Sequence, residues 1–168
     1  RGQGGMNRSM AGRGSPDLTI EPMTRDDLPE VLAIEVSSFA LPWTEEMFAT
    51  DLAQGTLAEV LVGRLPSAGT PPPIAGYICV WVVSDELHVN NMAVHPRWRR
   101  RGVATALLQA ALDHGRAGGA RSAFLEVRAS NEAAQGLYRQ FRFAPVGVRE
   151  RYYTHPVEDA VVMRRDGL

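Results

Sequence analysis

The sequence predicts a single mixed α/β domain, in which a seven-stranded, largely antiparallel sheet contains one parallel β-α-β unit and carries helices on both faces. Strand-like and helix-like segments follow one another in the order β-α-α-β-β-β-α-β-α-β-β. The strand-helix-strand succession in the middle favours a parallel, right-handed crossover, whereas the flanking pairs of strand-like runs favour antiparallel hairpins. With 168 residues, the chain suffices for one well-packed domain but not for two of ordinary size.

The composition limits the classes of function. Hydrophobic residues make up 45% of the chain and charged residues 22%, as in soluble globular proteins, and the net charge of -1 gives no general attraction to nucleic acid or an anionic membrane. The longest apolar runs fall short of the roughly 18 to 20 residues that span a bilayer. We therefore expect a cytoplasmic protein. Residues 1–16 are rich in Gly, Ser and Arg and predict a disordered leader, so the predicted domain covers residues 17–168.

The first elements are a strand and two helices. Residues 18–23 alternate as a half-buried strand does, and Thr24 then caps a predicted helix. Pro42 interrupts the chain before a second short helix, which is predicted to begin at Thr44 and to end at Gly55. The apolar positions of the first helix follow helical spacing at Leu28, Val31, Leu32 and Ile34.

Strand-like segments follow in the middle of the chain. Residues 58–65 and 74–83 predict a hairpin whose long connection, residues 66–73, is rich in Pro and Gly. A helix is predicted from Arg101 to about Arg116, where Gly118 and Gly119 stop it. The other predicted elements are strands over 86–94, 122–128, 143–153 and 157–163 and a helix over 131–141.

The run Arg99-Arg100-Arg101-Gly102-Val103-Ala104 joins a strand to a helix and forms a candidate anion site. The free N–H groups of the first helical turn and the helix dipole favour a phosphate, and the small Gly102 and Ala104 let it approach the backbone. The run is also compatible with a solvated basic turn or a nucleic-acid contact beside Trp98. A G-x-G-x-x-G fingerprint and a P-loop are both absent, which argues against a dinucleotide or a nucleoside triphosphate.

Two side chains are candidates for acid–base chemistry. Alternation along 122–128 places Glu126 opposite the buried side chains, at the carboxyl end of a central strand, where it can act as a general base or form an ion pair with Arg128. Tyr138 falls among the apolar positions of the next helix, as a core aromatic whose hydroxyl reaches the edge of the core. Asn131 is placed to cap that helix.

Cysteine and histidine usage gives little sign of other chemistry. A single cysteine, Cys79, excludes an intramolecular disulfide, and its apolar strand predicts a buried, inert thiol. The histidines show no paired ligand spacing, so we expect no metal site; they are His88, His95, His114 and His155.

Together these residues resemble a known family. Arg99-x-x-Gly102-x-Ala104 after Asn91-Met92-Ala93-Val94 resembles the acetyl-CoA signature of the GNAT N-acetyltransferase superfamily. The chain is most similar to the RimI-type ribosomal-protein-alanine N-acetyltransferases, in segments 39–44, 125–131, 137–138 and 151–153 and in Glu158-Asp159-Ala160. The resemblance spans residues 18–163, with Ala104 at a position where glycine is common and with longer segments at 66–73 and at the N-terminus.

The resemblance implies a role for each matching residue. Glu126 corresponds to the family's general base and Tyr138 to its general acid. Tyr152 and Tyr153 would grip the substrate's N-terminus, opposite the loop that contains Phe39, Pro42 and Trp43. The implied acetyl-CoA-binding residues are Met92, Ala93, Val94, Arg99, Arg100, Arg101, Gly102, Val103, Ala104, Thr105 and Asn131.

The implied reaction is acetyl transfer from acetyl-CoA to the α-amine of a protein, above all the N-terminal alanine of small-subunit ribosomal protein eighteen. The amine would attack directly in a ternary complex, without a metal and without contact with nucleic acid or membrane, in a monomer or weak dimer. Two alternatives remain open: acetylation of lysine side chains or small amines, and a non-catalytic module that binds acyl-CoA for regulation.

Overall fold

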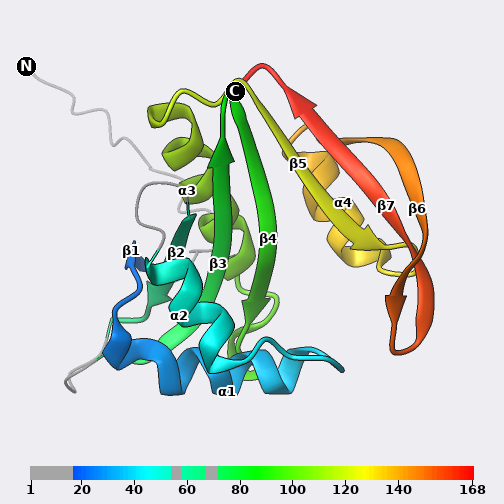
Figure 1. The fold of residues 1–168 in the computed structure, drawn as a ribbon. Coiled ribbons are helices and arrows are strands. Elements are labelled where there is room, and N and C mark those ends of the chain that lie inside the picture. Colours follow the sequence, from blue (N-terminus) through cyan, green and yellow to red (C-terminus); the bar gives the residue numbers. More distant parts are fainter. Residues whose placement is uncertain (1–16, 54–57, 67–71) are drawn as a thin grey trace, which may run out of the picture.

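The computed structural model describes residues 17–53, 58–66 and 72–168, and its strands form one sheet in the order β1-β2-β3-β4-β5-β7-β6 (Figure 1). The predicted succession of elements and the seven-stranded sheet are confirmed, while residues 1–16, Gly55 and residues 67–71 lie outside the described part. The elements are β1 (Thr19–Pro22), η1 (Arg25–Asp27), α1 (Leu28–Ser38), α2 (Glu45–Ala53), β2 (Ala58–Arg64), β3 (Ile74–Val83), β4 (Glu86–Val94), η2 (Pro96–Trp98), α3 (Val103–Ala117), β5 (Ser122–Arg128), α4 (Glu132–Gln140), β6 (Ala144–Thr154) and β7 (Val157–Asp166).

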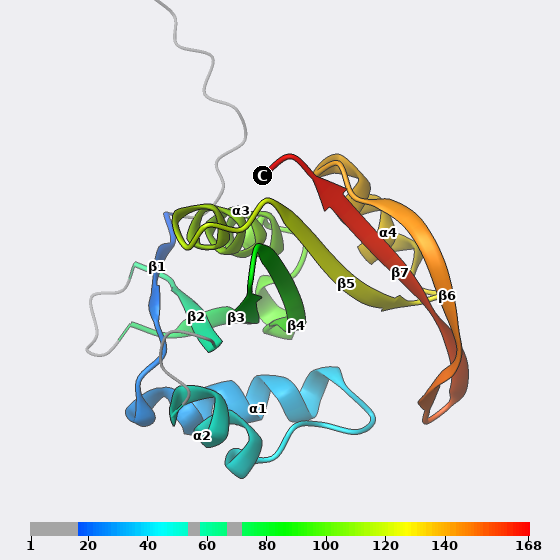
Figure 2. The ribbon, with the colours of Figure 1, turned by 45° about the horizontal axis from the view of Figure 1, so that its top comes forward.

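The helices cover both faces of the sheet, as predicted (Figure 2). One face of the sheet packs against α1 and α2, and the other packs against α3 and α4. Successive side chains of β3 alternate between the two hydrophobic cores. Tyr77 and Cys79 lie in the core under α1 and α2, and Ile78 and Val80 lie in the core under α3 and α4. Any side chain of a central strand can therefore be assigned to the α1/α2 face or to the α3/α4 face.

The helix starts differ slightly from the prediction. Thr24 and Asp27 form a capping box around a single 3-10 turn, so the α-helix begins only at Leu28. Helix α3 begins at Val103, and the predicted start at Arg101 is wrong. Arg100 (φ 61°) and Gly102 (φ 81°) both adopt left-handed backbone conformations, which prolong the turn up to the helix.

Strands β4 and β5 are parallel but pair only along part of their length. Their register runs from Glu86↔Ser122 to Val89↔Leu125 and ends there. A bulge at Asn90 shifts the register of β4 against β3 at the same point. Beyond it β4 stays paired with β3 and β5 with β7, and Figure 1 shows the two strands diverging. Among the described strands, none pairs with the β5-facing edge of the last part of β4.

The β6–β7 hairpin forms the other edge of the sheet, and its turn extends past the end of β5 (Figure 2). Almost every residue of β6 is exposed.

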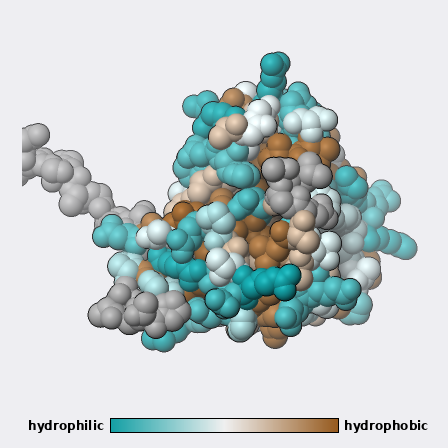
Figure 3. Space-filling model, turned by 60° about the vertical axis from the view of Figure 1, so that its left-hand side comes forward, coloured by the Kyte–Doolittle hydropathy of each residue, from teal (hydrophilic) through white to brown (hydrophobic). Residues whose placement is uncertain are grey.

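The face of the molecule in Figure 3 is mostly hydrophilic, with a strip of hydrophobic residues between the polar ones. Over the described residues, every helix is too short or too polar to cross a bilayer.

Candidate active site

Glu126 lies where β4 and β5 diverge. Its neighbours Leu125 and Val127 are buried in the core under α3 and α4, so its own side chain lies on the α1/α2 face, as the alternation predicts. The carboxylate pairs with Arg149 of β6, at 3.4 Å between Oε1 and Nε, and the predicted pairing with Arg128 is wrong. The side chain of Arg149 is 59% exposed, so this ion pair is loose and solvated.

Tyr138 approaches the same region from the other face. It lies in α4, almost buried in the α3/α4 core, and packs edge-on against Phe143, as expected of a core aromatic. Burial raises the pKa of Tyr138 to about 12, with a smaller contribution from Tyr153. The phenol therefore stays protonated near neutral pH and can donate a hydrogen bond.

Tyr153 connects the two candidate catalytic residues. Burial is the main cause that raises the pKa of this half-buried tyrosine to about 12. The charges of Tyr152, Glu126 and Glu158 contribute to the same shift, and the guanidinium of Arg128 opposes it. Tyr153 thus interacts electrostatically with both Glu126 and Tyr138. The three side chains belong to β5, α4 and β6 and share one neighbourhood beside the divergence of β4 and β5.

The arginine turn is folded against the rest of the molecule. Arg99 donates from Nε to the carbonyl oxygen of Val94 (3.2 Å) and from Nη2 to the hydroxyl of Ser38 (3.4 Å). The guanidinium of Arg101 lies over the ring of Trp98, 5.2 Å from its centroid. Two of the three arginines therefore have partners within the protein. The N–H groups of the first turn of α3 have no acceptors within the helix, and they leave this end open to an anion.

The predicted substrate-binding residues lie on two segments at the same end of the sheet. The connection from α1 to α2 carries Phe39, Pro42 and Trp43, and the β6–β7 hairpin carries Tyr152 and Tyr153. Figures 1 and 2 show this connection and the turn of the hairpin on the side where β4 and β5 have diverged. The rings of the two tyrosines meet edge-to-face, with 5.1 Å between centroids. Phe39 and Tyr152 are exposed.

Glu35 was missed as a functional candidate. The carboxylate is only 1% exposed, and its Oε1 accepts a hydrogen bond from the N–H of Trp43 at 2.8 Å. Its Oε2 accepts from the Asn91 amide at 2.8 Å and from the hydroxyl of Tyr77. Burial raises the pKa of Glu35, and the hydrogen bonds from Trp43 and Asn91 partly oppose this shift. The sequence signal for Glu35 is a carboxylate among the buried positions of α1. Through these hydrogen bonds, Glu35 connects the segment between α1 and α2 to β4.

Asn131 takes the structural role expected of it, because its side chain accepts a hydrogen bond from the N–H of Ala134 at 3.1 Å and caps α4. This cap places the residue directly after β5, on the strand end that carries Glu126. Its contact with the cofactor stays a prediction, as do the roles of the other predicted site residues.

Residues 28–143 match the sequence profile described as the Acetyltransferase (GNAT) family. The chain belongs to the GNAT acetyltransferase family. It is similar to the [Ribosomal protein bS18]-alanine N-acetyltransferase of Escherichia coli K12, 35% identical over 86% of this chain and 95% of the relative. It is also similar to the N-alpha-acetyltransferase RimI of Mycobacterium tuberculosis, 33% identical over 89% of this chain and 92% of the relative.

Two solved structures have the same fold. The ribosomal-protein-S18-alanine N-acetyltransferase from Escherichia coli superimposes with a TM-score of 0.77, at 35% identity over 89% of this chain and 93% of the other. Arabidopsis thaliana NAA60, solved with acetyl-CoA, has a TM-score of 0.77 at 18% identity over 89% of this chain and 98% of the other. The second likeness concerns the fold alone.

In this GNAT acetyltransferase, Cys79 is a buried strand residue, as predicted. It is fully buried, and burial raises the pKa of its thiol well above the usual value, which keeps it protonated and inert. Within the ranges that the structure describes, no three His, Cys, Asp or Glu side chains are grouped as metal ligands.

Proposed function

We propose that this protein transfers the acetyl group of acetyl-CoA to the N-terminal α-amine of a protein, with the N-terminal alanine of ribosomal protein bS18 as its substrate. The observation that carries this proposal is the approach of Glu126 and Tyr138 from opposite faces to the divergence of β4 and β5, beside Tyr153. The Escherichia coli relative, 35% identical over most of both chains, supports the choice of substrate.

The open edge of β4 and the start of α3 fit acetyl-CoA. No described strand pairs with the last part of β4 on its β5 side, so the main chain of Met92, Ala93 and Val94 would hydrogen-bond the pantetheine arm and stabilise the oxyanion. The first turn of α3, after the left-handed Gly102, would hold the pyrophosphate. Asn131 would contact the same molecule from the start of α4.

The protein's groups would move the protons of a direct transfer. The amine nitrogen forms a bond to the thioester carbonyl carbon, the C–S bond breaks, and the sulfur leaves as a thiolate. The neutral α-amine would displace the loosely held Arg149, and Glu126 would accept, through a water, the one proton that the nitrogen loses as the amide forms. The pKa of Tyr138, about 12, lies some three to four units above that of an ordinary thiol, so its hydroxyl would stabilise the leaving thiolate chiefly as a hydrogen-bond donor.

An α-amine suits this machinery better than a lysine. With a pKa of about 7.7 to 8.0, roughly a tenth of an α-amine is neutral at pH 7, against about one lysine in two thousand. The exposed Phe39 and Tyr152 would flank the first residues of a peptide.

We propose that the protein acts in the cytoplasm, as a monomer or weak dimer and without nucleic acid.

Two substitutions test the catalytic roles. Glu126→Gln and Tyr138→Phe should each lower turnover by about a hundredfold or more, since each removes an acid–base group, while acetyl-CoA affinity stays within about twofold. CoA release and calorimetric titration with acetyl-CoA measure the two quantities. Glu150→Gln, on the exposed strand β6, is the matched control and should retain normal turnover. Near-normal rates in both variants would contradict the assignment.

A CoA-release assay with short peptides tests the substrate class. Peptides that begin with Ala, Ser, Met or Thr, including the Ala-Arg start expected for bS18, should be acetylated in preference to N-terminally blocked peptides with an internal lysine. A preference for the blocked peptides or for small amines would favour the other acetyltransferase alternative. Acetyl-CoA binding without CoA release on any acceptor would identify a non-catalytic module.

A further inference from the structure

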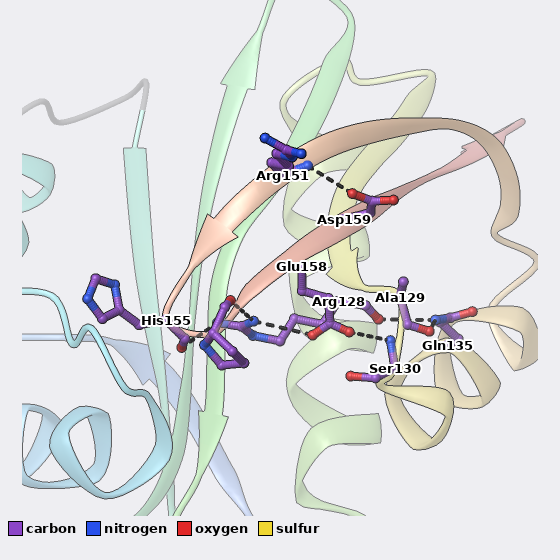
Figure 4. Close-up of polar contacts among 9 residues, drawn as sticks. Arg128, Ala129, Ser130, Gln135, Arg151, His155, Glu158 and Asp159 are labelled. Atoms are coloured by element: carbon purple, nitrogen blue, oxygen red, sulfur yellow. Dashed lines mark hydrogen bonds and ion pairs between the residues drawn. The ribbon is translucent and has the colours of Figure 1, made fainter.

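The side chain of Arg128, at the end of β5, reaches the turn of the β6–β7 hairpin (Figure 4). Arg128 donates from Nη2 to the carbonyl oxygen of His155 at 3.1 Å and from Nη1 to that of Pro156 at 3.2 Å. The same guanidinium lies over the ring of Tyr153, 4.2 Å from its centroid. Arg128 therefore holds both the backbone of the turn and one of the two predicted peptide-gripping tyrosines.

Glu158 completes this attachment from β7. Its Oε1 accepts from Nη1 of Arg128 at 3.3 Å, and its Oε2 accepts from the N–H of Ser130 at 2.7 Å. Hydrogen bonding from Ser130 lowers the pKa of Glu158, so the carboxylate is ionised at neutral pH. Gln135 of α4 holds the end of β5, because its amide donates to the carbonyl oxygens of Arg128 (3.1 Å) and Ala129 (3.0 Å). The hairpin, the end of β5 and the start of α4 form one connected unit (Figure 4).

These contacts go beyond what the hairpin needs to fold. Strands β6 and β7 are already paired next to the turn, with Tyr153 opposite Glu158 and Thr154 opposite Val157. The ladder between β5 and β7 reaches Ala160, and the N–H of Ala129 donates to the carbonyl oxygen of Asp159. Arg128 extends this attachment to the turn itself, at His155 and Pro156. Arg128 follows Glu126 by two residues on the same strand, so both side chains lie on the α1/α2 face. A rigid strand and a planar guanidinium thus set the place of Tyr153 relative to Glu126.

We propose that Arg128, held by Glu158, is a positioning residue for the peptide substrate. It keeps the hairpin tyrosines where the N-terminus of the peptide can reach Glu126, directly or through one water. This inference rests on the function proposed above. Reacting groups must be placed closely, and a displacement of about 1 Å can lower rates by about a hundredfold. Losing the attachment would therefore weaken productive peptide binding without altering the cofactor edge of β4.

Arg128→Lys tests this role because it keeps the positive charge. A lysine is a point donor and cannot bond two carbonyl oxygens and a carboxylate while stacking on Tyr153. We expect the KM for an Ala-Arg peptide to rise about tenfold, as expected for lost charge-assisted hydrogen bonds. The dissociation constant of acetyl-CoA should change by less than about twofold. The side chain of Arg128 bonds the hairpin turn and Glu158, and Asn131 bonds only the main chain of Arg128, which the substitution keeps.

Arg164→Lys is the matched control. Arg164 lies on β7, over the ring of Phe124 at 4.7 Å, and pairs with Asp166 at 2.7 Å, so the same change removes similar contacts elsewhere on the sheet. Its peptide KM should stay within about twofold of the unsubstituted protein, since the site is distant from the hairpin turn. An equal rise in both variants, or an unchanged peptide KM in folded Arg128→Lys, overturns the proposal.

A second variant and a second measurement cover a failure of Arg128→Lys to fold. Glu158→Gln weakens the bonds to Arg128 and Ser130 but keeps the shape, and it should raise the peptide KM several-fold; an unchanged KM overturns the proposal. Hydrogen exchange should become faster at residues 152–158 in either variant and stay unchanged in α3. Absent CoA release by the unsubstituted protein contradicts the proposed function, whereas unchanged exchange at the hairpin contradicts the role of Arg128.

Discussion

At the scale of single residues, two tyrosines with the same high pKa face the proposed reaction site. Both Tyr138 and Tyr153 have a pKa of about 12, and burial is the largest cause of the shift in each. Both phenols are therefore neutral over the whole range in which a protein α-amine titrates. The pH dependence of turnover should therefore reflect the amine, while Tyr138 remains a hydrogen-bond donor throughout.

The raised pKa values predict a loss of stability at high pH. The folded-state pKa of Tyr138 exceeds its unfolded value of about 10, so its contribution is fully present below pH 10 and disappears as the pH rises to about 12. For this nearly buried residue the contribution is about 2–3 kcal/mol. Urea unfolding at about pH 9 and about pH 11.5 measures the loss. It should be smaller in Tyr138→Phe, and an equal loss in that variant would argue against this source.

Gly102 should matter more for acetyl-CoA binding than the neighbouring charges do. Its φ of 81° suits glycine and strains a β-branched residue, so Gly102→Val should displace the N–H groups of the first turn of α3 and weaken binding by about tenfold or more. Arg100→Ala removes one exposed charge and should cost up to about fivefold. Calorimetric titration of both variants with acetyl-CoA decides the order. A larger effect of Arg100→Ala would show that charge dominates.

For single residues, the sequence predicts which face of the sheet or helix a side chain lies on better than it predicts which residue that side chain contacts. Alternation in β5 correctly places Glu126 on the face opposite Leu125 and Val127. It does not identify Arg149 as the partner of Glu126, because that contact depends on where β6 lies after the sheet has formed. Similarly, helical spacing includes Glu35 in the buried stripe of α1, but its partners belong to a loop and two strands that follow much later in the chain.

At the scale of elements, local patterns locate the strands but not their neighbours. The predicted strands over 86–94 and 122–128 agree with β4 and β5 to the residue. The insertion of β7 between β5 and β6 and the short pairing of β4 with β5 have no local signal, because they result from long-range packing and a bulge. The helix starts were less accurate, since left-handed residues such as Arg100 are not apparent from composition.

Gly76 links the packing of α3 to the shape of β4. A Cβ at this position would lie 2.8 Å from the carbonyl oxygen of Ala93 and 3.1 Å from Leu107. Gly76→Ala should therefore shift β4, lower the free energy of unfolding by about 1–3 kcal/mol and weaken acetyl-CoA binding. Urea unfolding and calorimetric titration measure these effects. Gly147→Ala in β6, where a Cβ meets nothing within 4 Å, is the control and should leave acetyl-CoA affinity unchanged.

At the scale of the whole molecule, the sheet consists of two parts with a short junction. Strands β1 to β4 form one part and β5 to β7 the other, joined by the ladder from Glu86↔Ser122 to Val89↔Leu125 and by the α3/α4 core. The proposed acetyl-CoA site includes β4 and α3 on one side and the start of α4 on the other. Binding should therefore hold the two parts together.

A melting experiment tests this bridging. Acetyl-CoA at about a hundred times its dissociation constant should stabilise the fold by about 2.7 kcal/mol and raise the Tm by about 5–10 °C. Differential scanning calorimetry measures the shift. Pantetheine, which lacks the pyrophosphate and would engage only the β4 edge, should give a smaller shift at the same concentration. No shift with acetyl-CoA would contradict the proposed site.

The unpaired edge of β4 has one more consequence, for the end of the reaction. A main-chain edge and a helix N-terminus recognise the pantetheine arm and the pyrophosphate, and CoA retains both after the acetyl group has left. We therefore expect CoA to compete with acetyl-CoA for the same contacts and its departure to limit turnover. The rate of acetylation in the cell would then depend on the ratio of acetyl-CoA to CoA, so the extent of substrate acetylation would vary with the metabolic supply of acetyl-CoA.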